Sequence, residues 1–417
     1  MFSIYRFLTV FFYPIFVAII FLRKLIKKED SARYKEKIFS SSFLPKRNSV
    51  KKLIWFHAAS IGEVQSILPL IFKLNQDNKN LEFLITTVTL SSGNFIKKKI
   101  FNCSNINHRY FPVDSFFLIK KFLNAWSPNL ILFVDSEIWP NLIFEAKRRN
   151  ISTIIINGRI TKKTFKKWKM ISHSAKKIFN CFDLCLASSH ESKKYLEELN
   201  AKNVKCFGNI KLAGSLDIEN IKNENESFLN RKKFWCAAST HKGEELFCLK
   251  THINIKKIYK NIVTIIIPRH INRTNEINLL CKKLNLNSQI LNINELIQDD
   301  KEVIIINAFG ELPNYFKYSK SVFIGKSILK KFEQVGGQNP IEAAKLGCKI
   351  YHGPYVYNFN EIYSLLKSFE ISKEIIDEKE ISIELIKDLE TPKLVQNNIS
   401  QKINDLGNRI LNENIKE

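Results

Sequence analysis

The stretch GGQNPIEAAKLG occupies residues 336–347 and begins with Gly336, Gly337, Gln338, Asn339, Pro340, Ile341 and Glu342. The glycine pair allows the backbone to come close to a ligand, and Asn339 before Pro340 is typical of an N-cap followed by the first residue of a helix. A helix N-terminus presents free N–H groups and a partial positive charge, so a phosphate could bind there. Glu342 lies in the predicted first turn, where its carboxylate could accept hydrogen bonds from ribose hydroxyls. An ordinary capped helix would carry the same residues, so this stretch alone does not identify a nucleotide site.

The composition indicates the size of the fold and the charge of its partners. A chain of 417 residues is long for one domain, so we expect two. The formal net charge of +25 indicates an anionic partner, which could be nucleic acid, an anionic membrane or a phosphorylated substrate. The charge alone does not choose among these three classes.

Residues 1–28 predict a membrane anchor. Residues 7–22 carry no charge, whereas Arg6 precedes them and Arg23, Lys24, Lys27 and Lys28 follow. Residues 2–22 reach the roughly 20-residue length that spans a bilayer if Arg6 extends its charge to the interface. No small-residue cleavage site follows, which argues against a cleaved signal peptide. We expect the lysine-rich flank and the rest of the chain on the cytoplasmic side, next to anionic lipid.

After about residue 50, short apolar runs alternate with helical patterns, as in buried parallel strands joined by helices. The predicted strands form a first series, 52–57, 82–89, 130–137, 152–157, 183–188 and 204–207, and a second series, 233–238, 262–268, 302–309, 321–325 and 349–352. The stretch 214–232 is polar and is a predicted linker. The sequence therefore predicts an α/β protein with two Rossmann-like domains, 29–213 and 233–417, facing each other across a cleft.

A lysine-rich segment at residues 160–179 holds seven lysines mixed with Phe165, Trp168, Met170 and Ile171. As a basic amphipathic helix it could lie at lipid headgroups or guide an anionic lipid. A solvated helix with one stripe facing the core explains the same pattern equally well.

The first predicted strand leads into HAASIGE, whose small residues leave a crevice at the carboxyl end of the sheet. Ser60, Gly62 and Glu63 lie at the start of the following helix. Glu63 could take a proton from a substrate hydroxyl, or it could be a helix-start residue that the helix dipole stabilises.

A second group of charged residues follows the strand at 130–137. Asp135 and Glu137 would share one face of this strand, where they could bind a metal or shape an acceptor pocket. The histidines are scattered and no further ligand cluster is evident, which argues against a metal. Lys211, in the sequence FGNIK, ends the domain at a position where it could face the cleft.

Four strand ends in the second domain point to a nucleotide site. The turn AASTHKGEE at 237–245 offers hydroxyls and N–H groups, and Pro268 and Arg269 end the next strand with a cation. Phe309, Gly310 and Glu311 begin another helix, and the stretch from residue 336 completes the group. The chain contains neither a GxGxxG fingerprint nor a GxxxxGK[ST] loop, which weakens NAD-binding and ATP-hydrolysing readings.

The motifs HAASIGE, EIWPN, GNIK, ASTHKGEE, PRH, GEL, GGQNPIEA and HGPYVYNF occur in this order over nearly the whole chain. In this order they resemble the 3-deoxy-D-manno-octulosonic acid (Kdo) transferases of lipopolysaccharide synthesis. The resemblance implies a GT-B architecture, with the acceptor on the first domain and the nucleotide sugar on the second. It also implies inverting transfer of Kdo from CMP-Kdo to a lipid A precursor, lipid IVA, at the cytoplasmic face of the inner membrane, without metal or cofactor.

By position, the resemblance places the catalytic base on Glu63 and two groups that stabilise the transition state on Asp135 and Lys211. It places the CMP contacts on Pro268, Arg269, Phe309, Gly310, Glu311, Asn339, Pro340, Ile341 and Glu342. Three positions depart from the usual family pattern, because Asp135 replaces glutamate, Lys326 replaces a second glycine and Gln338 replaces histidine. The loop at 330–335 is also a few residues longer.

Two other functions fit parts of the sequence. A metal-dependent transferase acting on another membrane lipid would use Asp135 and Glu137. A non-enzymatic membrane protein that binds anionic lipid or nucleic acid would explain the charge but not the ordered motifs. We expect CMP-Kdo, a lipid A precursor and anionic inner-membrane lipid as partners, and no nucleic acid.

Overall fold

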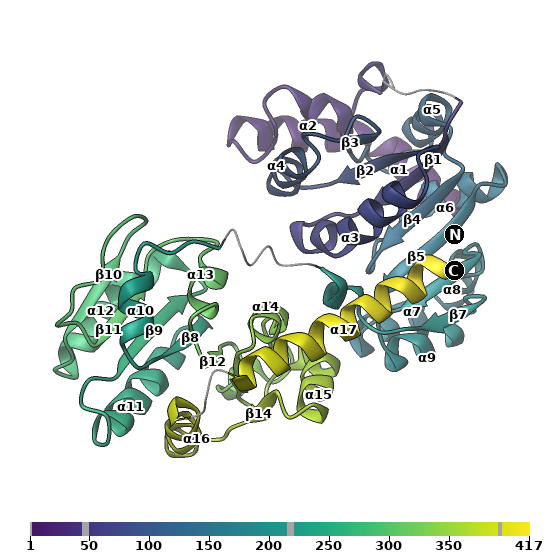
Figure 1. Cartoon of the computed structure of the whole chain (residues 1–417). Coiled ribbons are helices and arrows are strands. Elements are labelled where there is room, and N and C mark those ends of the chain that lie inside the picture. The colour runs from purple at the N-terminus through teal and green to yellow at the C-terminus, as the bar shows by residue number, and fades with distance from the viewer. Residues whose placement is uncertain (1, 44–49, 215–220, 391–393) are drawn as a thin grey trace. The chain divides into compact units, whose positions relative to one another are not determined.

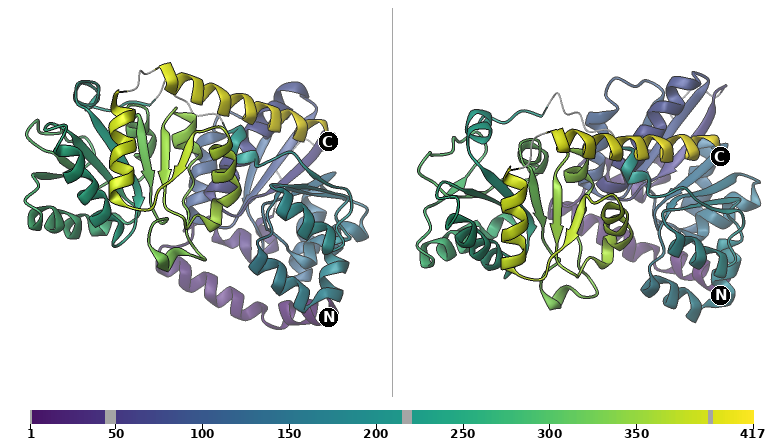
Figure 2. Two further views of the ribbon diagram at one scale, coloured as in Figure 1. Left: turned by 90° about the horizontal axis from the view of Figure 1, so that it is seen from below. Right: turned by 60° about the horizontal axis from the view of Figure 1, so that its bottom comes forward.

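The computed structural model describes residues 2–43, 50–214, 221–390 and 394–417. The chain divides into two compact units, one of residues 1–214 and 407–417 and the other of residues 215–406. Each unit contains one seven-stranded sheet whose strands pair in parallel (Figures 1 and 2). This confirms the predicted pair of parallel-sheet α/β domains.

The strands of the first sheet are β1 (Lys52–His57), β2 (Leu81–Thr87), β3 (Ile106–Tyr110), β4 (Leu130–Val134), β5 (Ser152–Gly158), β6 (Leu184–Ala187) and β7 (Val204–Cys206). They lie in the order β3-β2-β1-β4-β5-β6-β7. The helices between them are α3 (Ile61–Asp77), α4 (Leu90–Lys99), α5 (Phe116–Trp126), α6 (Pro140–Arg148), α7 (Lys162–Met170), α8 (Ser172–Phe179) and α9 (His190–Glu198). Helix α3 contacts α4, whereas α5 and α8 contact α6, as in a doubly wound fold.

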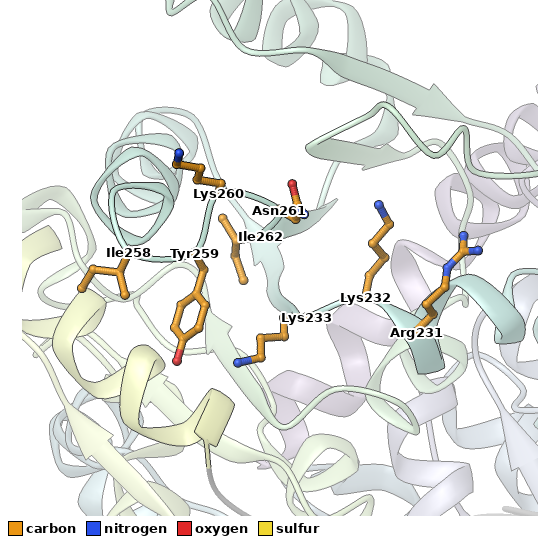
Figure 3. Close-up of a pocket in the computed structure, with 8 residues that line it drawn as sticks. All are labelled: Arg231, Lys232, Lys233, Ile258, Tyr259, Lys260, Asn261 and Ile262. Atoms are coloured by element: carbon orange, nitrogen blue, oxygen red, sulfur yellow. The ribbon is translucent and has the colours of Figure 1, made fainter.

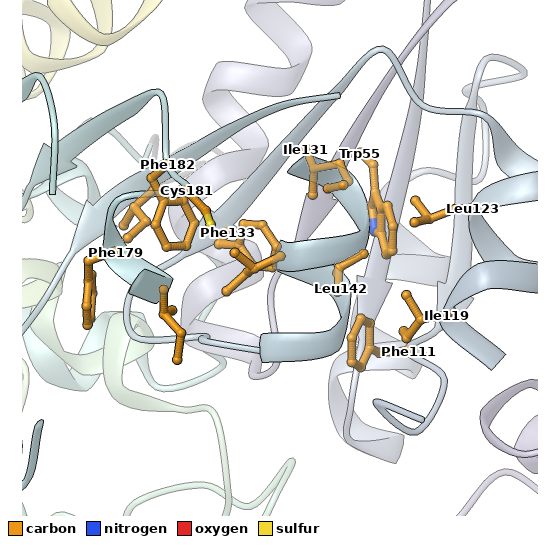
Figure 4. Packing of buried hydrophobic residues seen from close by; sticks show 14 of the residues in the cluster. Trp55, Phe111, Ile119, Leu123, Ile131, Phe133, Leu142, Phe179, Cys181 and Phe182 are labelled. Atoms are coloured by element: carbon orange, nitrogen blue, oxygen red, sulfur yellow. The ribbon is translucent and has the colours of Figure 1, made fainter. Parts of the chain in front are cut away.

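The centre of the first sheet is buried by aromatic residues from strands and helices. Trp55 of β1 is fully buried, and its ring centroid lies 4.9 Å from that of Phe122 in α5. Phe133 of β4 packs edge-on against Phe182 with 5.6 Å between the ring centroids (Figure 4). Polar residues begin only where these apolar strands end, so the core determines where the functional groups emerge.

The strands of the second sheet are β8 (Phe234–Thr240), β9 (Val263–Pro268), β10 (Ser288–Leu291), β11 (Val303–Ile306), β12 (Ser321–Ile324), β13 (Lys349–His352) and β14 (Ser372–Glu374). They lie in the order β10-β11-β9-β8-β12-β13-β14. The helices are α11 (Glu244–Lys256), α12 (Thr274–Lys283), α13 (Leu312–Phe316), α14 (Ile341–Lys345), α15 (Asn360–Ser368) and α16 (Glu378–Glu390).

In each sheet the strand order reverses at one point. The reversal falls between β1 and β4 in the first sheet and between β8 and β12 in the second. Open α/β sheets bind ligands outside the carboxyl ends of the strands at such a point. The topology therefore marks one candidate site in each unit.

Every strand predicted from the sequence is present, and its ends differ from the prediction by at most three residues. The prediction missed β3, β10 and β14, which lie at the edges of the two sheets. Edge strands need not be apolar on both faces: β3 reads INHRY, and β10 and β14 have only four and three residues. A search for continuous apolar runs therefore passes over them.

The predicted single anchor helix is instead two helices, α1 (Phe2–Phe11) and α2 (Tyr13–Leu25), with an angle of 51° between them (Figure 2). Pro14, in the first turn of α2, has no N–H with which to continue the hydrogen bonding of α1. Among the described helices, none has by itself the length and hydropathy needed to cross a bilayer, whereas this bent pair taken together does.

Three other boundaries differ from the prediction. Residues 160–179 form two helices, α7 and α8, rather than one. Of the predicted linker, residues 215–220 lie outside the described residues, and Glu226–Arg231 form helix α10. The second domain was predicted to extend to residue 417, but α17 (Leu394–Lys416) returns to the first unit, where Glu417 pairs with Lys205.

Candidate active site

Glu63 is held by the turn that joins β1 to α3. The Ser60 hydroxyl accepts a hydrogen bond from the Glu63 N–H at 3.4 Å and donates one to Glu63 Oε1 at 2.8 Å. The Ala59 N–H donates to Glu63 Oε2 at 2.7 Å. The Ser60 N-cap and these two hydrogen bonds to the carboxylate fix Glu63 at the carboxyl end of β1. Gly62 beside it is exposed, with open space where a Cβ would lie.

Asp135 and Lys211 are far apart in the sequence, but the structure brings them together. Lys211, in the 3-10 turn η3 (Ile210–Ala213), places Nζ 2.8 Å from Asp135 Oδ2. The Asn157 amide of β5 donates to Asp135 Oδ1 and accepts from the Ile210 N–H at 3.0 Å. Asn157 therefore links the ends of β4 and β5 to the turn that carries Lys211.

The predicted placement of Asp135 and Glu137 on one face of a strand is wrong. Strand β4 ends at Val134, and Asp135 has a φ of 57°, so the chain turns before Glu137. Glu137 Oε2 lies 3.3 Å from His57 Nε2 and accepts from the Trp139 indole at 2.9 Å. Burial would raise the pKa of Glu137, but His57 and Trp139 together hold it below its usual value.

The environment of Glu63 raises its pKa to about 7. Burial contributes most, and the negative charges of Asp135 and then Glu137 add to it. The hydrogen bonds from Ser60 and the Ala59 N–H act in the opposite direction, because they stabilise the charged form. A carboxylate with this pKa can accept a proton near neutral pH, as a general base must.

The lysine-rich helix α7 lies beside this group. A small cavity next to Asp135 is also lined by Thr164 and Trp168 of α7. Phe165 and Trp168 pack against the core, as the predicted core-facing stripe requires. The lysines on the other side are exposed: Lys162, Lys163, Lys166, Lys167 and Lys169. Within the described part of the chain, a carboxylate lies within 4.0 Å of Lys169 but not of the other four.

At the reversal point of the second sheet, Glu244 organises the loop that follows β12. Its carboxylate accepts hydrogen bonds from the N–H groups of His241 at 2.9 Å, Lys326 at 2.6 Å, Ser327 at 2.9 Å and Ile328 at 3.3 Å. Lys326 has a φ of 60°, a conformation that glycine adopts most easily. This explains why a glycine is expected at this position from the sequence resemblance.

The glycine pair packs against the protein's own backbone. A Cβ on Gly336 would lie 2.0 Å from the carbonyl oxygen of Tyr355, and Gly337 has a φ of 89°. The Gly337 N–H donates to the Lys326 carbonyl at 2.7 Å. From the sequence, we interpreted the glycine pair as making room for a ligand. The structure shows that glycines are already required here because two loops of the protein cross at this point.

The helix after the glycine pair begins at Ile341, one residue later than predicted, and has only five residues. Asn339 nevertheless acts as a cap, because its Oδ1 accepts from the Ile341 N–H at 3.1 Å, while Pro340 precedes the helix. Burial raises the pKa of Glu342, although the neighbouring Lys345 opposes the shift. Burial also lowers the pKa of Lys345 to about 8.

The remaining predicted contacts lie at the carboxyl edge of the same sheet. Pro268 ends β9, and Arg269 after it is exposed. Phe309 and Gly310 follow β11 and are exposed, and Glu311 immediately precedes α13. These residues and the stretch from Gly336 therefore belong to one edge of one sheet.

Comparisons with known proteins bear on this pair of sites. A family model described as 3-Deoxy-D-manno-octulosonic-acid transferase (kdotransferase) matches residues 32–213. The 3-deoxy-D-manno-octulosonic acid transferase of Rickettsia bellii is 31% identical over 382 residues, which cover 91% of this chain and 86% of that protein. This chain belongs to the Kdo transferase family. The transferase of the same description from Haemophilus influenzae is 30% identical and covers 75% of this chain, matching 73% of that protein.

The enzyme is therefore a glycosyltransferase, and its fold recurs in other nucleotide-sugar proteins. A solved UDP-GlcNAc 2-epimerase from Neisseria meningitidis matches 88% of this chain and all of its own length with a TM-score of 0.59. At 15% identity, this likeness concerns the fold alone.

The transferase also has a hollow at the opposite edge of its second sheet, before β8 and β9 (Figure 3). Lys233 lies over the ring of Tyr259, 4.0 Å from its centroid, and Arg231 pairs with Asp299. Lys232 donates to the Asp299 carbonyl at 3.2 Å, so three of the four cations that line this hollow have partners, and the hollow lies at the edge away from the predicted residues.

Sequence reasoning overlooked the roles of His57, Asn157 and Glu244. Each is buried and lies in the last two residues of a strand or at the first residue of a helix, at the carboxyl edge of a sheet. Each also binds a group that the sequence analysis had named. In the sequence, the feature that could have pointed to these three residues is a polar side chain at or near the end of an apolar run. That signal locates the edge of the sheet but not the partner.

The pH dependence of kcat/KM should report the pKa of Glu63. Because a general base must be deprotonated, we expect kcat/KM to fall below about pH 7. Asp135→Asn removes a negative neighbour and should move this decline to lower pH. Ser60→Ala removes a hydrogen bond to the charged form and should move it to higher pH. Shifts in the same direction, measured on the residual activity of both variants, would contradict the assignment.

Proposed function

We propose that this transferase moves Kdo from CMP-Kdo to a lipid A precursor, lipid IVA, at the cytoplasmic face of the inner membrane, with inversion and without metal or cofactor. Membership of the Kdo transferase family supports the sugar that is transferred. The observation that carries the mechanism is the Glu63 carboxylate, whose pKa is raised to about 7 beside the Asp135–Lys211 pair. The motifs at the carboxyl edge of the second sheet support a CMP-bearing donor.

In the proposed reaction, Glu63 takes the proton of an acceptor hydroxyl as the oxygen attacks the anomeric carbon of Kdo. A new C–O bond forms on one face of the sugar while the C–O bond to the CMP phosphate breaks on the other, so the configuration inverts. The anomeric carbon gains positive charge, which the negative charge of Asp135 stabilises. Lys211 holds the Asp135 carboxylate in place through the 2.8 Å contact.

The electron pair of the broken C–O bond passes to the phosphate oxygen of CMP, which is the leaving group. We assign this group to Arg269 and to the stretch from Asn339 to Glu342, with Glu342 accepting hydrogen bonds from the ribose. No described residue donates a hydrogen bond to the Glu342 carboxylate, which is half-buried. A ribose hydroxyl would supply such a donor.

The acceptor is a phosphorylated lipid in this proposal, and α7 is the surface that binds its phosphates. Lys162 and Lys163 occupy the first turn of α7, where the helix dipole disfavours cations. Helix stability therefore does not explain why lysines stand in this turn. Binding of an anionic ligand at this helix, near Asp135, would explain their presence.

Glu63→Ala should lower the rate of Kdo transfer by about 10²–10⁴-fold while CMP still binds, because the base is lost and the second unit is unchanged. Product masses after incubation with CMP-Kdo and a lipid A precursor measure transfer, and calorimetry measures CMP binding. Glu191→Ala, which removes a first-turn glutamate of α9, is the matched control and should leave transfer unchanged. Undiminished turnover in Glu63→Ala would reject the base.

Transfer should remain complete in excess EDTA. Asp135 is already bound by Lys211 and Asn157, and Glu137 by His57 and Trp139, so neither carboxylate is held for a shared metal ion. The same assay with and without added Mg²⁺ tests this. Activity that EDTA removes and Mg²⁺ restores would instead favour a metal-dependent transferase.

Replacing Lys162, Lys163, Lys166 and Lys167 by Glu should raise KM for the lipid acceptor about 10-fold or more and leave CMP affinity unchanged, because charged hydrogen bonds to phosphate are lost. The matched control makes the same charge change at exposed lysines elsewhere, Lys97, Lys98, Lys282 and Lys283. Equal KM values for the two variants would show that α7 is only a solvated surface.

A further inference from the structure

The N-terminal helices α1 and α2 direct their apolar side chains away from the protein. Most of the exposed apolar residues recur every three or four positions, which places them on one side of each helix, and Phe12 and Phe21 are exposed beside them. We call this the outer face: Ile4, Phe7, Leu8, Phe11, Ile15, Ile19, Leu22, Leu25 and Ile26. Phe7 is 65% exposed and Leu22 is 60% exposed. A surface helix of a soluble domain has the opposite arrangement.

The inner side of α1 makes polar contacts with the first unit. The Tyr5 hydroxyl donates to Asp114 Oδ2 at 2.9 Å, and the Asn141 amide donates to Thr9 Oγ1 at 3.0 Å. Thr9, Asp114 and Asn141 are buried. Withdrawal of α1 would leave these polar groups without their partners in a dry environment, which is costly.

Helix α2 is fixed to the same unit by a small apolar cluster and an ion pair. Ile20 packs against Tyr34 and Ile38, which are also buried. Arg23 Nε lies 2.7 Å from Glu29 Oε1. Both helices are therefore part of the folded first unit and not a separate stalk.

The contact with α1 continues to the carboxylate site. Asp114 accepts from the N–H groups of Asn141 and Leu142, both at 3.0 Å, and so caps α6. Helix α6 follows Glu137 and Trp139 directly. One buried aspartate thus connects α1 to the segment that carries Glu137.

We propose that α1 and α2 lie within one leaflet of an anionic bilayer, with the outer face among the acyl chains and the inner side on the first unit. This inference concerns the helix pair and does not depend on Kdo transfer. A spanning anchor would pull Tyr5 and Thr9 away from Asp114 and Asn141. With ten residues, α1 rises about 15 Å, half of the roughly 30 Å of a bilayer core.

Charge identifies lipid as the occupant of the outer face. Lys27 and Lys28 are exposed at the end of α2, next to Leu25 and Ile26. Apolar side chains flanked by lysines match the boundary between acyl chains and anionic headgroups. A second copy of this chain would instead bring like charges together, at a net charge of +25 per chain.

Vesicle flotation of the full chain tests the outer face. The parent should bind vesicles of phosphatidylglycerol and phosphatidylethanolamine more tightly than vesicles of phosphatidylcholine. Phe7→Ser combined with Leu22→Ser should weaken binding about 100-fold, because two inserted apolar side chains are lost. Ile293→Ser with Leu296→Ser, at exposed apolar positions of the second unit, should have no effect. Unchanged binding of the Phe7/Leu22 variant, or parent chains that associate with each other instead of with vesicles, would overturn the proposal.

Labelling with a membrane-impermeant maleimide separates one leaflet from a full span. Ser3→Cys reports the start of α1, and Lys163→Cys reports the exposed side of α7 in the same unit. If α1 and α2 remain in one leaflet, both variants should be labelled from the same side of inner-membrane vesicles. Labelling from opposite sides would show that the pair crosses the bilayer. The unsubstituted chain gives the background from its native cysteines.

Discussion

The first unit depends on keeping three carboxylates close together at one edge of a sheet. Like charges in a half-buried site repel, so each needs its own source of stabilisation. Asp135 has Lys211, Glu137 has His57 and Trp139, and Glu63 has a serine hydroxyl and a backbone N–H. Burial and the neighbouring acids raise the pKa of Glu63, and its own partners are neutral groups that only partly oppose this rise. The different partners of the three acids thus determine which of them can accept a proton near neutral pH.

In the second unit, several irregular loops lie at one edge of the sheet and have to be held in place. Glu244 does this by accepting four backbone hydrogen bonds from two loops. The glycine pair allows a third segment to cross within a distance that a side chain would block. Backbone packing therefore explains several motif residues that, in the sequence, look like ligand contacts.

The sequence predicted the architecture well because buried parallel strands are continuous apolar runs that can be read one at a time. It predicted the ends of strands less well, and this mattered at Asp135, where a left-handed residue ends β4 early and separates two acids. Edge strands were missed because their burial is partial. The pairing of Asn157 with Asp135, or of His57 with Glu137, could not be predicted, since the sequence contains the residues but not the register that places them side by side.

Helix α17 has a consequence for how the chain connects the two units. The chain passes from the first unit to the second near residue 214, and it passes back inside this helix at residues 406–407. Gly407 stands at the return, where a Cβ would lie 2.1 Å from the Leu212 carbonyl oxygen. Residues 407–417 therefore belong to the first unit but are covalently attached to the second. A chain cut near residue 214 would still carry this piece of the first unit at the end of the second.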